Sequence, residues 1–287
     1  MHIVSDRGMD LPTEEMQGLD IHLVPLTLTL DGKTYRSGID IQPEEFYRLL
    51  ASTESFPTTS QPSPGDFADL YRELARTDPE ILSIHISSGL SGTLNAAEIG
   101  AQMVPEAQVT FVDTRTLSGA EGWQVQAAAR AVKAGWAKEK ILQTLDKIRA
   151  ATDTVFTLAE LKYLIHGGRI SHMKGLLASM LSVKPIIGVE KVHGTYANYA
   201  QVRSFEKALH GIAEHIAAQY AQGIALRAQI MHAFNPQGAE LLRAHMDEMF
   251  KCTWLPVSPI APVLGAHTGP SLVGIAYAPL DQYPELA

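Results

Sequence analysis

The sequence predicts an α/β protein with two α/β lobes, in which the N-terminal lobe holds a mostly parallel sheet. Short runs rich in β-branched and aromatic residues alternate with segments of helical periodicity along the chain. The runs Ile81–Ile86 (ILSIHI) and Gln108–Asp113 (QVTFVD) indicate buried strands, and Thr93–Met103 between them can form a helix. A strand–helix–strand unit places its two strands parallel in one sheet, and this arrangement defines the fold class.

Further elements of the N-terminal part follow from the same periodicities. Residues 1–6 (MHIVSD) have the pattern of a strand rather than that of a leader peptide, which would start with a basic region followed by an apolar one. Two apolar stripes at helical spacing predict helices, and they comprise Phe67, Leu70, Tyr71 and Leu74 after Pro64, and Ile141, Leu142, Leu145 and Ile148.

The pattern changes after about residue 155. The predicted strands are Thr154–Leu158, Lys184–Val189, Thr195–Val202, Ala228–Ala233, Thr253–Val257 and Leu272–Ala278, and the predicted helices are Ala159–His166, Ser204–Tyr220 and Pro236–Phe250. We therefore assign residues 1–153 to the N-terminal lobe and residues 154–287 to the C-terminal lobe. This boundary is soft, because no linker rich in proline, glycine or serine marks it.

The composition favours a globular protein of the cytoplasm. Of the 287 residues, 46% are hydrophobic and 19% are charged, which is enough for a sizeable core. The single cysteine, Cys252, excludes an internal disulfide and fits a reducing compartment. A net charge of −8 without a basic stretch argues against nucleic acid as a partner. No apolar run approaches about 18 residues, so stable membrane insertion is not expected.

Four polar segments punctuated by glycine or proline are the candidates for chemistry, and two of them lie in the N-terminal part. Residues 58–64 (TTSQPSP) present several hydroxyls, although they can equally be a loop in which Ser63 or a neighbour caps a helix. Residues 87–93 (SSGLSGT) follow a buried strand and open a helix, where free N–H groups favour an anion such as a carboxylate. Simple N-capping by Ser91 remains the alternative.

The other two segments lie in the C-terminal part. Residues 167–171 (GGRIS) carry Arg169, which can reach a ligand or pair with a carboxylate of the protein, the commoner use of an arginine. Gly167 and Gly168 are also typical of a left-handed helix C-cap. Residues 263–270 (VLGAHTGP) place His267 in a predicted glycine-rich loop, where it can donate to an anion or satisfy a local backbone group.

The signatures of nucleotide, metal and nucleophilic enzymes do not occur in the sequence. It contains no GxGxxG, GxxxxGK[ST] or HExxH pattern and no Ser/His/Asp signature. The eleven histidines are scattered, so no metal site is predicted. Hydroxyls, backbone amides and one histidine are a set that suits the binding of a carboxylate in a ligand pocket.

Taken in order, these segments resemble the DegV family, whose better-understood members are the fatty-acid-binding subunits of bacterial fatty acid kinase. The resemblance spans nearly the whole chain, through IVSDRGMDLP, PLTLTLDGKTYRSGIDI, TTSQPSPGDF, ISSGLSGTLNAA, FVDTRTLSGAEG, LIHGGRIS, VKPIIGV and VLGAHTGPSLVG. It implies two α/β lobes with a ligand tunnel between or within them. It also implies a long-chain fatty acid such as palmitate, stearate or oleate as the ligand.

The resemblance implies particular site residues as well. The family's contacts to the fatty acid carboxylate fall on Thr59, Ser91 and His267 of this sequence, and the neighbouring Ser88 and Gly92 are weaker candidates. We interpret Arg169 as a structural residue near this site.

A further implication of the resemblance is a protein partner. Family members of this kind present their lipid to a separate ATP-dependent fatty acid kinase, and Arg203 in VRSFEKAL resembles a position that contacts it. No catalytic residue and no cofactor is implied, so we expect no enzymatic activity from the chain alone.

Arg7 stands where a serine is usual and Ser37 where an aspartate is usual, and Ala266 and Ser271 also depart from the pattern. The changes at Arg7 and Ser37 leave partner docking and lipid preference open.

Two alternatives come from other classes of protein. The family's fold also occurs in dihydroxyacetone kinase and in a sugar-phosphotransferase component, so the chain could be an enzyme or a phosphotransfer component that acts on a small anionic substrate. His267 would then accept a phosphoryl group or anchor the substrate. The other alternative is a regulatory interaction module that carries lipid incidentally.

Overall fold

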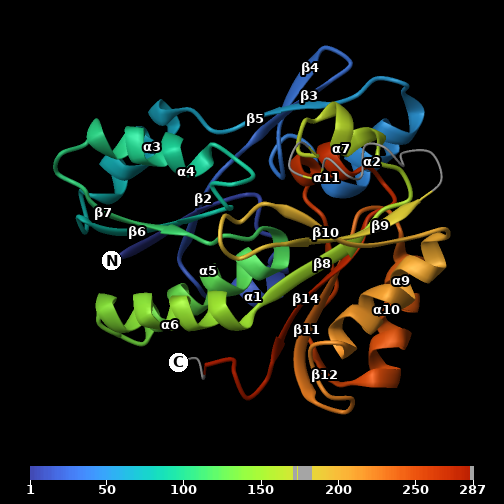
Figure 1. The fold of residues 1–287 in the computed structure, drawn as a ribbon. Helices are drawn as coiled ribbons and strands as arrows, with labels where there is room; N and C mark the ends of the chain where they lie inside the picture. The colour runs from blue at the N-terminus through green and yellow to red at the C-terminus, as the bar shows by residue number, and fades with distance from the viewer. Residues whose placement is uncertain (171–172, 174–182, 285–287) are drawn as a thin grey trace.

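A parallel sheet forms the N-terminal part of the protein, as predicted. The computed structural model describes residues 1–170, 173 and 183–284. The first sheet has the strand order β2-β1-β6-β7, all parallel, with bounds Ile21–Val24, His2–Asp6, Glu80–His85 and Gln108–Asp113. In Figure 1, helices α3 (Pro64–Leu74) and α4 (Thr93–Gln102) cover one face, and α5 (Ser118–Lys133) and α6 (Lys138–Ala151) cover the other. The α/β fold class is thereby confirmed.

The strand order creates a crevice at one edge of this sheet. From β1 the chain continues to β2 on one side, whereas from β6 it continues to β7 on the other side. The segments that leave the carboxyl ends of β1 and β6 therefore diverge, and such a switch point is where open α/β sheets usually bind ligands. The SSGLSGT segment leaves β6 at this point.

A small antiparallel sheet, which the sequence did not predict, lies beside this crevice. It has the order β4-β3-β5 with bounds Lys33–Arg36, Thr27–Leu30 and Thr58–Ser60. Helix α2 (Pro43–Ser52) connects β4 to β5, and the short helix α1 (Thr13–Met16) precedes β2 in sequence. Thr58–Ser60 is thus a strand and not part of a loop, because it pairs with β3. The predicted cap further on is correct, since Ser63 accepts a hydrogen bond from the Asp66 amide and forms a capping box.

The second large sheet comprises strands from the C-terminal part. Its order is β10-β9-β8-β14-β11-β12, with bounds Tyr196–Val202, Lys184–Val189, Asp153–Thr157, Val273–Pro279, Ala225–His232 and Lys251–Trp254, and β13 (Ser258–Pro259) also pairs with β11. Helices α9 (Phe205–Ala217) and α10 (Pro236–Met249) pack on one face (Figure 1). The predicted strand Thr253–Val257 is wrong at its end, because the paired residues stop at Trp254.

Two segments of the C-terminal part differ from the sequence-based prediction. The helix expected over Ala159–His166 is shorter, α7 (Lys162–His166), and it ends as expected, with Gly168 in the left-handed region at φ 74°. The glycine-rich loop expected around His267 is instead a helix, α11 (Pro262–Thr268). Gly265 lies inside this helix and leaves room for Tyr47, since an added Cβ would come within 2.3 Å of the Tyr47 hydroxyl.

One apolar core joins the two parts of the chain. The largest cluster of buried residues includes Leu28 and Trp123 as well as Phe156 and Met231. The buried Trp123 indole also donates a hydrogen bond to Gln229 Oε1 at 2.7 Å. Because residues from both sides share this core, the lobe boundary at residues 153–154 stays a prediction.

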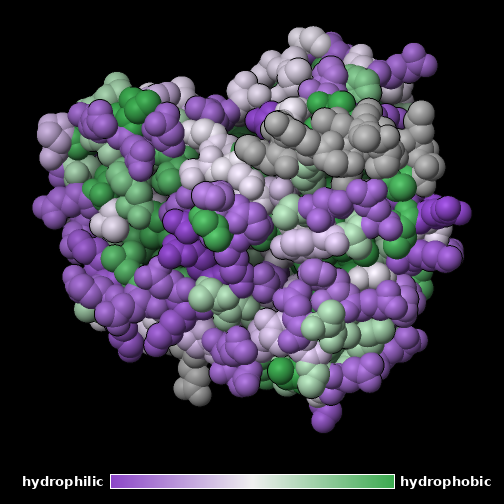
Figure 2. Space-filling model, in the orientation of Figure 1, coloured by the Kyte–Doolittle hydropathy of each residue, from purple (hydrophilic) through white to green (hydrophobic). Residues whose placement is uncertain are grey.

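The surface is mainly polar on the face shown in Figure 2, where apolar patches are small and separated. None of the described helices combines the length and the apolar character that crossing a membrane requires.

A buried polar chain ties the two central strands of the first sheet together. His85 on β6 contacts Asp6 Oδ2 on β1 through Nδ1 at 3.0 Å and Ser83 Oγ through Nε2 at 2.7 Å, and Ser83 contacts the Tyr71 hydroxyl at 2.7 Å. Asp6 Oδ2 also accepts a hydrogen bond from the Ile86 amide, at the start of the segment that leads to SSGLSGT. These contacts hold the origin of that segment in place.

We expect His85→Ala to lower the free energy of unfolding by about 3–5 kcal/mol, since it leaves Asp6 and Ser83 buried without their partner. Tyr71→Phe is the matched control, because it removes only one neutral hydrogen bond and should cost about 0.5–1.5 kcal/mol. Urea unfolding of both variants measures the difference, provided that the m-value is unchanged. Equal losses would contradict a structural role for the Asp6–His85 contact.

Candidate functional site

A cavity of about 330 Å³ lies where the segment after β6, the small sheet and helix α11 meet, and we call it the junction cavity. Elements far apart in the sequence supply its walls. The lining residues are Leu26, Thr59, Ser60, Gln61, Ile86, Leu90, Ser91, Leu117, Arg169, Tyr196, Val263, Leu264 and His267. Polar and apolar side chains are therefore both present, as is usual in a ligand pocket.

Four of the predicted site residues line the junction cavity: Thr59, Ser91, Arg169 and His267. The two weaker candidates do not. The Ser88 hydroxyl is exposed and donates to Asp113 Oδ2 at 2.6 Å. Gly92 packs against the side chain of Gln61. A Cβ on residue 92 would lie 2.1 Å from Gln61 Oε1, so Gly92 leaves room for Gln61 and makes no side-chain contact of its own.

Thr59 and His267 form the central polar contact of the cavity. The Thr59 hydroxyl lies 2.7 Å from His267 Nε2, across 208 positions of sequence. In β5, Thr58 and Ser60 are exposed while Thr59 between them is half-buried, because alternate residues of a strand face opposite sides. His267 Nδ1 is buried and has no hydrogen-bond partner among the described residues. It lies so close to Gly167 that an added Cβ there would come within 2.1 Å.

The charges around the cavity favour an anion. Burial and, as the smaller cause, the nearby Arg169 together lower the pKa of His267 from its ordinary value of 6.5 to about 4, so the imidazole is neutral at pH 7. Arg169 donates to the Gly167 carbonyl at 2.6 Å. Among the described lining residues Arg169 is the only charged side chain, and no carboxylate balances it. The described contacts therefore do not pair Arg169 with a protein carboxylate.

Ser91 does not cap helix α4. The N-cap residue is Gly92, which makes no side-chain cap bond, so the capping alternative for Ser91 is wrong. The Ser91 hydroxyl instead contacts the Thr93 hydroxyl at 2.8 Å and accepts weakly from the Thr93 amide at 3.3 Å. The side chain remains on the cavity wall, close to the start of α4.

An apolar extension adjoins the junction cavity and leads into the shared core. The two spaces have Leu117, Tyr196 and Leu264 in common. Beyond these residues the extension is lined by Ser118, Thr154, Phe156, Met231, Ile260, Thr268, Leu272 and Gly274, and its residual volume is about 20 Å³. The site thus has a polar end and an apolar end.

Sequence reasoning did not single out two of the polar lining residues, Gln61 and Tyr196. Gln61 lies inside the TTSQPSP segment that was recognised as polar, so its neighbours gave a usable signal. Tyr196 is the first residue of β10, and nothing in a strand pattern marks such a residue as a ligand contact. Arg203, by contrast, is exposed just before α9 and does not line the junction cavity.

The fold and the cavity define an α/β protein with a cavity that has polar and apolar walls. The chain belongs to the DegV family, whose model matches residues 1–280. A DegV domain-containing protein of Staphylococcus aureus strain N315 is 34% identical over 278 residues, which are 95% of this chain and 96% of that protein. The resemblance that the ordered motifs suggested is therefore confirmed.

Solved structures of related proteins agree with this assignment. A DegV family protein from Thermus thermophilus, whose structure is described as showing fatty acid binding, matches with a TM-score of 0.88 at 32% identity, covering 97% of this chain and 99% of that one. DegV of Bacillus subtilis, described as a fatty acid binding protein, matches with a TM-score of 0.85 at 28% identity, covering 97% and 98%.

The lowered pKa of His267 makes the stability of the protein depend on pH. The unfolded chain takes up a proton near pH 6.5 and the folded chain only near pH 4, so stability from this group is complete above pH 6.5 and is lost as the pH falls toward 4. We expect the difference in unfolding free energy between wild type and His267→Gln to shrink by about 3 kcal/mol over that interval. Urea unfolding at several pH values measures it.

The exposed His193 provides the control for this experiment. A His193→Gln variant should follow the wild-type pH dependence, since the other titrating groups are common to both proteins and cancel in the comparison. A constant difference between wild type and His267→Gln from pH 7 to pH 4 would contradict the buried, neutral state of His267.

Proposed function

We propose that this protein binds a long-chain fatty acid, with the carboxylate in the junction cavity and the acyl chain in the apolar extension. The observation that carries the proposal is the unbalanced charge of Arg169 beside hydroxyls and a neutral imidazole, at the polar end of a space that continues into the core. A carboxylate with a long apolar tail satisfies both ends. The fatty-acid-binding descriptions of the Thermus thermophilus and Bacillus subtilis relatives support the same ligand.

The tail and the head group contribute differently to binding. Burial of about 14 methylenes at roughly 0.8 kcal/mol each gives a gross gain near 11 kcal/mol before the costs of association. A hydrogen bond to the carboxylate adds about 1.5–3 kcal/mol. The small residual volume means that lining side chains must rotate to admit the chain, and the unbranched Met231 is well suited to do so. The tail thus sets retention, and the head-group contacts set position.

In this proposal the protein presents its fatty acid to a separate ATP-dependent kinase. The sequence has no phosphate-binding motif of its own. Thr59, Ser91 and His267 hold the carboxylate, so that a phosphoryl group can be delivered to it from outside, and the exposed Arg203 contacts the kinase. Phosphoryl transfer to His267 itself fits less well, because Nε2 is paired with Thr59 and Nδ1 lies against Gly167.

We expect Ser91→Ala and His267→Ala to retain bound fatty acid but to lose most acyl phosphorylation by the kinase. Transfer needs placement of the carboxylate to about an ångström, whereas retention depends on the tail. Lipid extraction with mass spectrometry and a kinase assay on the same preparations measure the two properties. Wild-type phosphorylation by both variants would remove these residues from the site.

Two methionines of equal burial give the matched test of the acyl path. Met231 and Met246 are 1% and 0% exposed, but only Met231 lines the apolar extension. Met231→Gln should therefore lose bound fatty acid, and Met246→Gln should keep it at a similar cost in stability. Equal lipid content of the two folded variants would contradict the proposed path of the chain.

A third variant tests the proposed partner surface. Arg203→Ala should leave the fold and the lipid content unchanged and should slow acyl phosphorylation, because Arg203 is exposed outside the junction cavity. Arg76→Ala, at another exposed arginine, is the control and should behave as wild type. Unchanged kinetics in Arg203→Ala would exclude Arg203 from the contact with the kinase, and ATP-dependent phosphorylation without added kinase would contradict the presenting role.

A further inference from the structure

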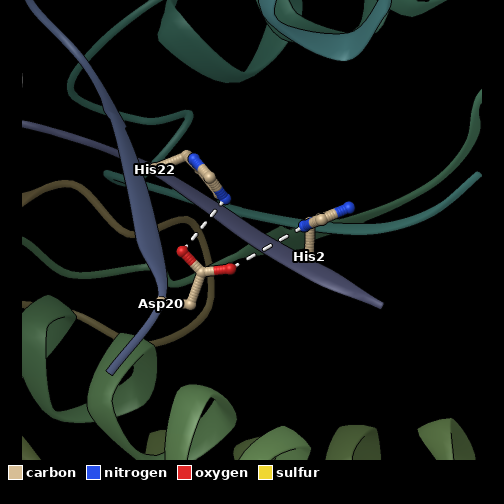
Figure 3. A group of neighbouring side chains, drawn as sticks. All are labelled: His2, Asp20 and His22. Carbon is tan, nitrogen blue, oxygen red and sulfur yellow. Dashed lines mark ion pairs between the residues drawn. The ribbon is translucent and has the colours of Figure 1, made fainter. Parts of the chain in front are cut away.

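Two histidines and an aspartate meet at the edge of the first sheet, at the amino ends of its strands. They are His2 on β1, Asp20 just before β2, and His22 on β2 (Figure 3). The junction cavity lies beyond the opposite, carboxyl ends of the strands, so the two sites are separate. The sequence reasoning above predicted no metal site, because it treated the histidines as scattered.

The register of the sheet explains why these residues meet. In the parallel pair, Ile3 lies opposite Ile21 and Val4 lies opposite His22. One step earlier, Asp20 comes beside His2. His2 and His22 are then diagonal neighbours on one face, because residues two apart in a strand point the same way. Their rings meet edge to face with centroids 5.5 Å apart.

Both imidazoles turn a ring nitrogen toward the same carboxylate. His2 Nδ1 lies 3.9 Å from Asp20 Oδ2, and His22 Nε2 lies 3.3 Å from Asp20 Oδ1 (Figure 3). His22 Nε2 is buried, yet it makes no hydrogen bond with any described residue. The described contacts therefore leave this nitrogen available to an added group beside the carboxylate.

A neighbouring threonine fixes the orientation of the His2 ring. The Thr77 hydroxyl donates its single hydrogen to the Leu74 carbonyl at 3.0 Å. In its contact with His2 Nε2 at 2.9 Å it must therefore accept, so the proton of the imidazole sits on Nε2. Nδ1 then carries a bare lone pair that faces a carboxylate oxygen. A positive charge is needed between these two acceptors, either a proton on Nδ1, which makes His2 an imidazolium, or a metal ion.

We propose that His2, Asp20 and His22 bind a divalent transition metal ion such as Zn²⁺, with solvent in the remaining position. Bonds of about 2.0–2.2 Å in a tetrahedral site place the ligand atoms about 3.4 Å apart. One ligand atom from each residue lies within 4.8 Å of the others, and the exposed Asp20 side chain must rotate to bring a single oxygen to about 3.4 Å from both nitrogens. Imidazole and carboxylate together suit Zn²⁺ better than Mg²⁺ or Ca²⁺. Thr77, which orients the ring of one ligand, is a typical supporting contact of such a site.

Binding has a structural consequence for the sheet. β2 is an edge strand that pairs only with β1 in the order β2-β1-β6-β7 of this sheet. A metal ion held by one residue of β1 and two residues of the β2 segment clamps this edge in place. Because the ion binds the folded form, it stabilises the protein by RT ln(1 + c/Kd) at a free Zn²⁺ concentration c, so the melting temperature rises with the logarithm of the ion concentration once this exceeds the Kd.

The test is Zn²⁺ binding by a chain that starts at Met1 and carries no histidine tag, measured by competition with a chromophoric chelator. No residue is added before Met1, because the Met1 amine pairs with Asp78 near the site. We expect one Zn²⁺ per chain, a loss of affinity of at least about 100-fold in Asp20→Asn, and a loss of about tenfold in Thr77→Val. Asp20 is 78% exposed, so its variant should fold normally.

A second pair of histidines on the surface provides the matched control. His210 and His245 also stack edge to face, at 4.9 Å, and have Glu214 and Glu248 beside them. Among the described residues, however, three ligand atoms converge only at His2, Asp20 and His22. The double variant His210→Gln/His245→Gln should therefore bind Zn²⁺ like wild type.

Four results would overturn the proposal: no binding of one equivalent by wild type, equal affinity in Asp20→Asn, reduced affinity in the His210/His245 control, or equally tight binding of Mg²⁺. A Zn²⁺-dependent rise in melting temperature that disappears in Asp20→Asn would support the clamp. Lipid content should be the same in all of these variants, so the result is independent of the proposed fatty acid binding.

Discussion

The contact between Thr59 and His267 is the constraint on which the candidate site depends. It joins β5 of the small sheet to the last turn of α11, two elements that nothing in their local sequence relates. The close approach of the two side chains depends on two glycines that have no Cβ. Tyr47 packs against Gly265 of α11, and Gly167 leaves room for the His267 imidazole. A side chain larger than hydrogen at either glycine would move the helix and separate the two polar groups.

Burial gives this contact its chemical character. A solvated histidine would be charged part of the time, but the low pKa of His267 keeps it neutral, and Arg169 alone then sets the sign of the site. In the proposed function, one cation with hydroxyls would position a carboxylate without a full ion-pair network, and the acyl tail would supply most of the affinity.

Much of this arrangement could be predicted from the sequence, and the failures have physical causes. Alternating periodicities identified the first sheet, and the ordered motifs identified the polar segments. Helix α11 was missed because Gly265 was interpreted as a loop residue. In the structure it is a helical residue, and its missing side chain leaves room for Tyr47. The sequence analysis ranked Ser88 below Ser91 by resemblance alone, and the structure gives a physical reason, since Ser88 donates to Asp113 while Ser91 lines the junction cavity. The group around Asp20 was missed because only the strand register brings it together.

Helix α11 also links the site to the segment that leaves β1. Its first turn begins where the Ala261 amide donates to the buried carboxyl of Asp10 at 2.8 Å, and its last turn carries His267. Burial raises the pKa of Asp10 from 3.8 to about 7, so the folded chain retains a proton there that the unfolded chain releases, and stability falls as the pH rises through this interval. His267 acts in the opposite direction between pH 4 and 6.5. The effects of Asp10 and His267 on the free energy of unfolding therefore oppose each other over nearly the same pH range. A weak overall pH dependence of stability is thus compatible with two strongly shifted pKa values. A variant that removes one of the two groups exposes the pH dependence that the other contributes.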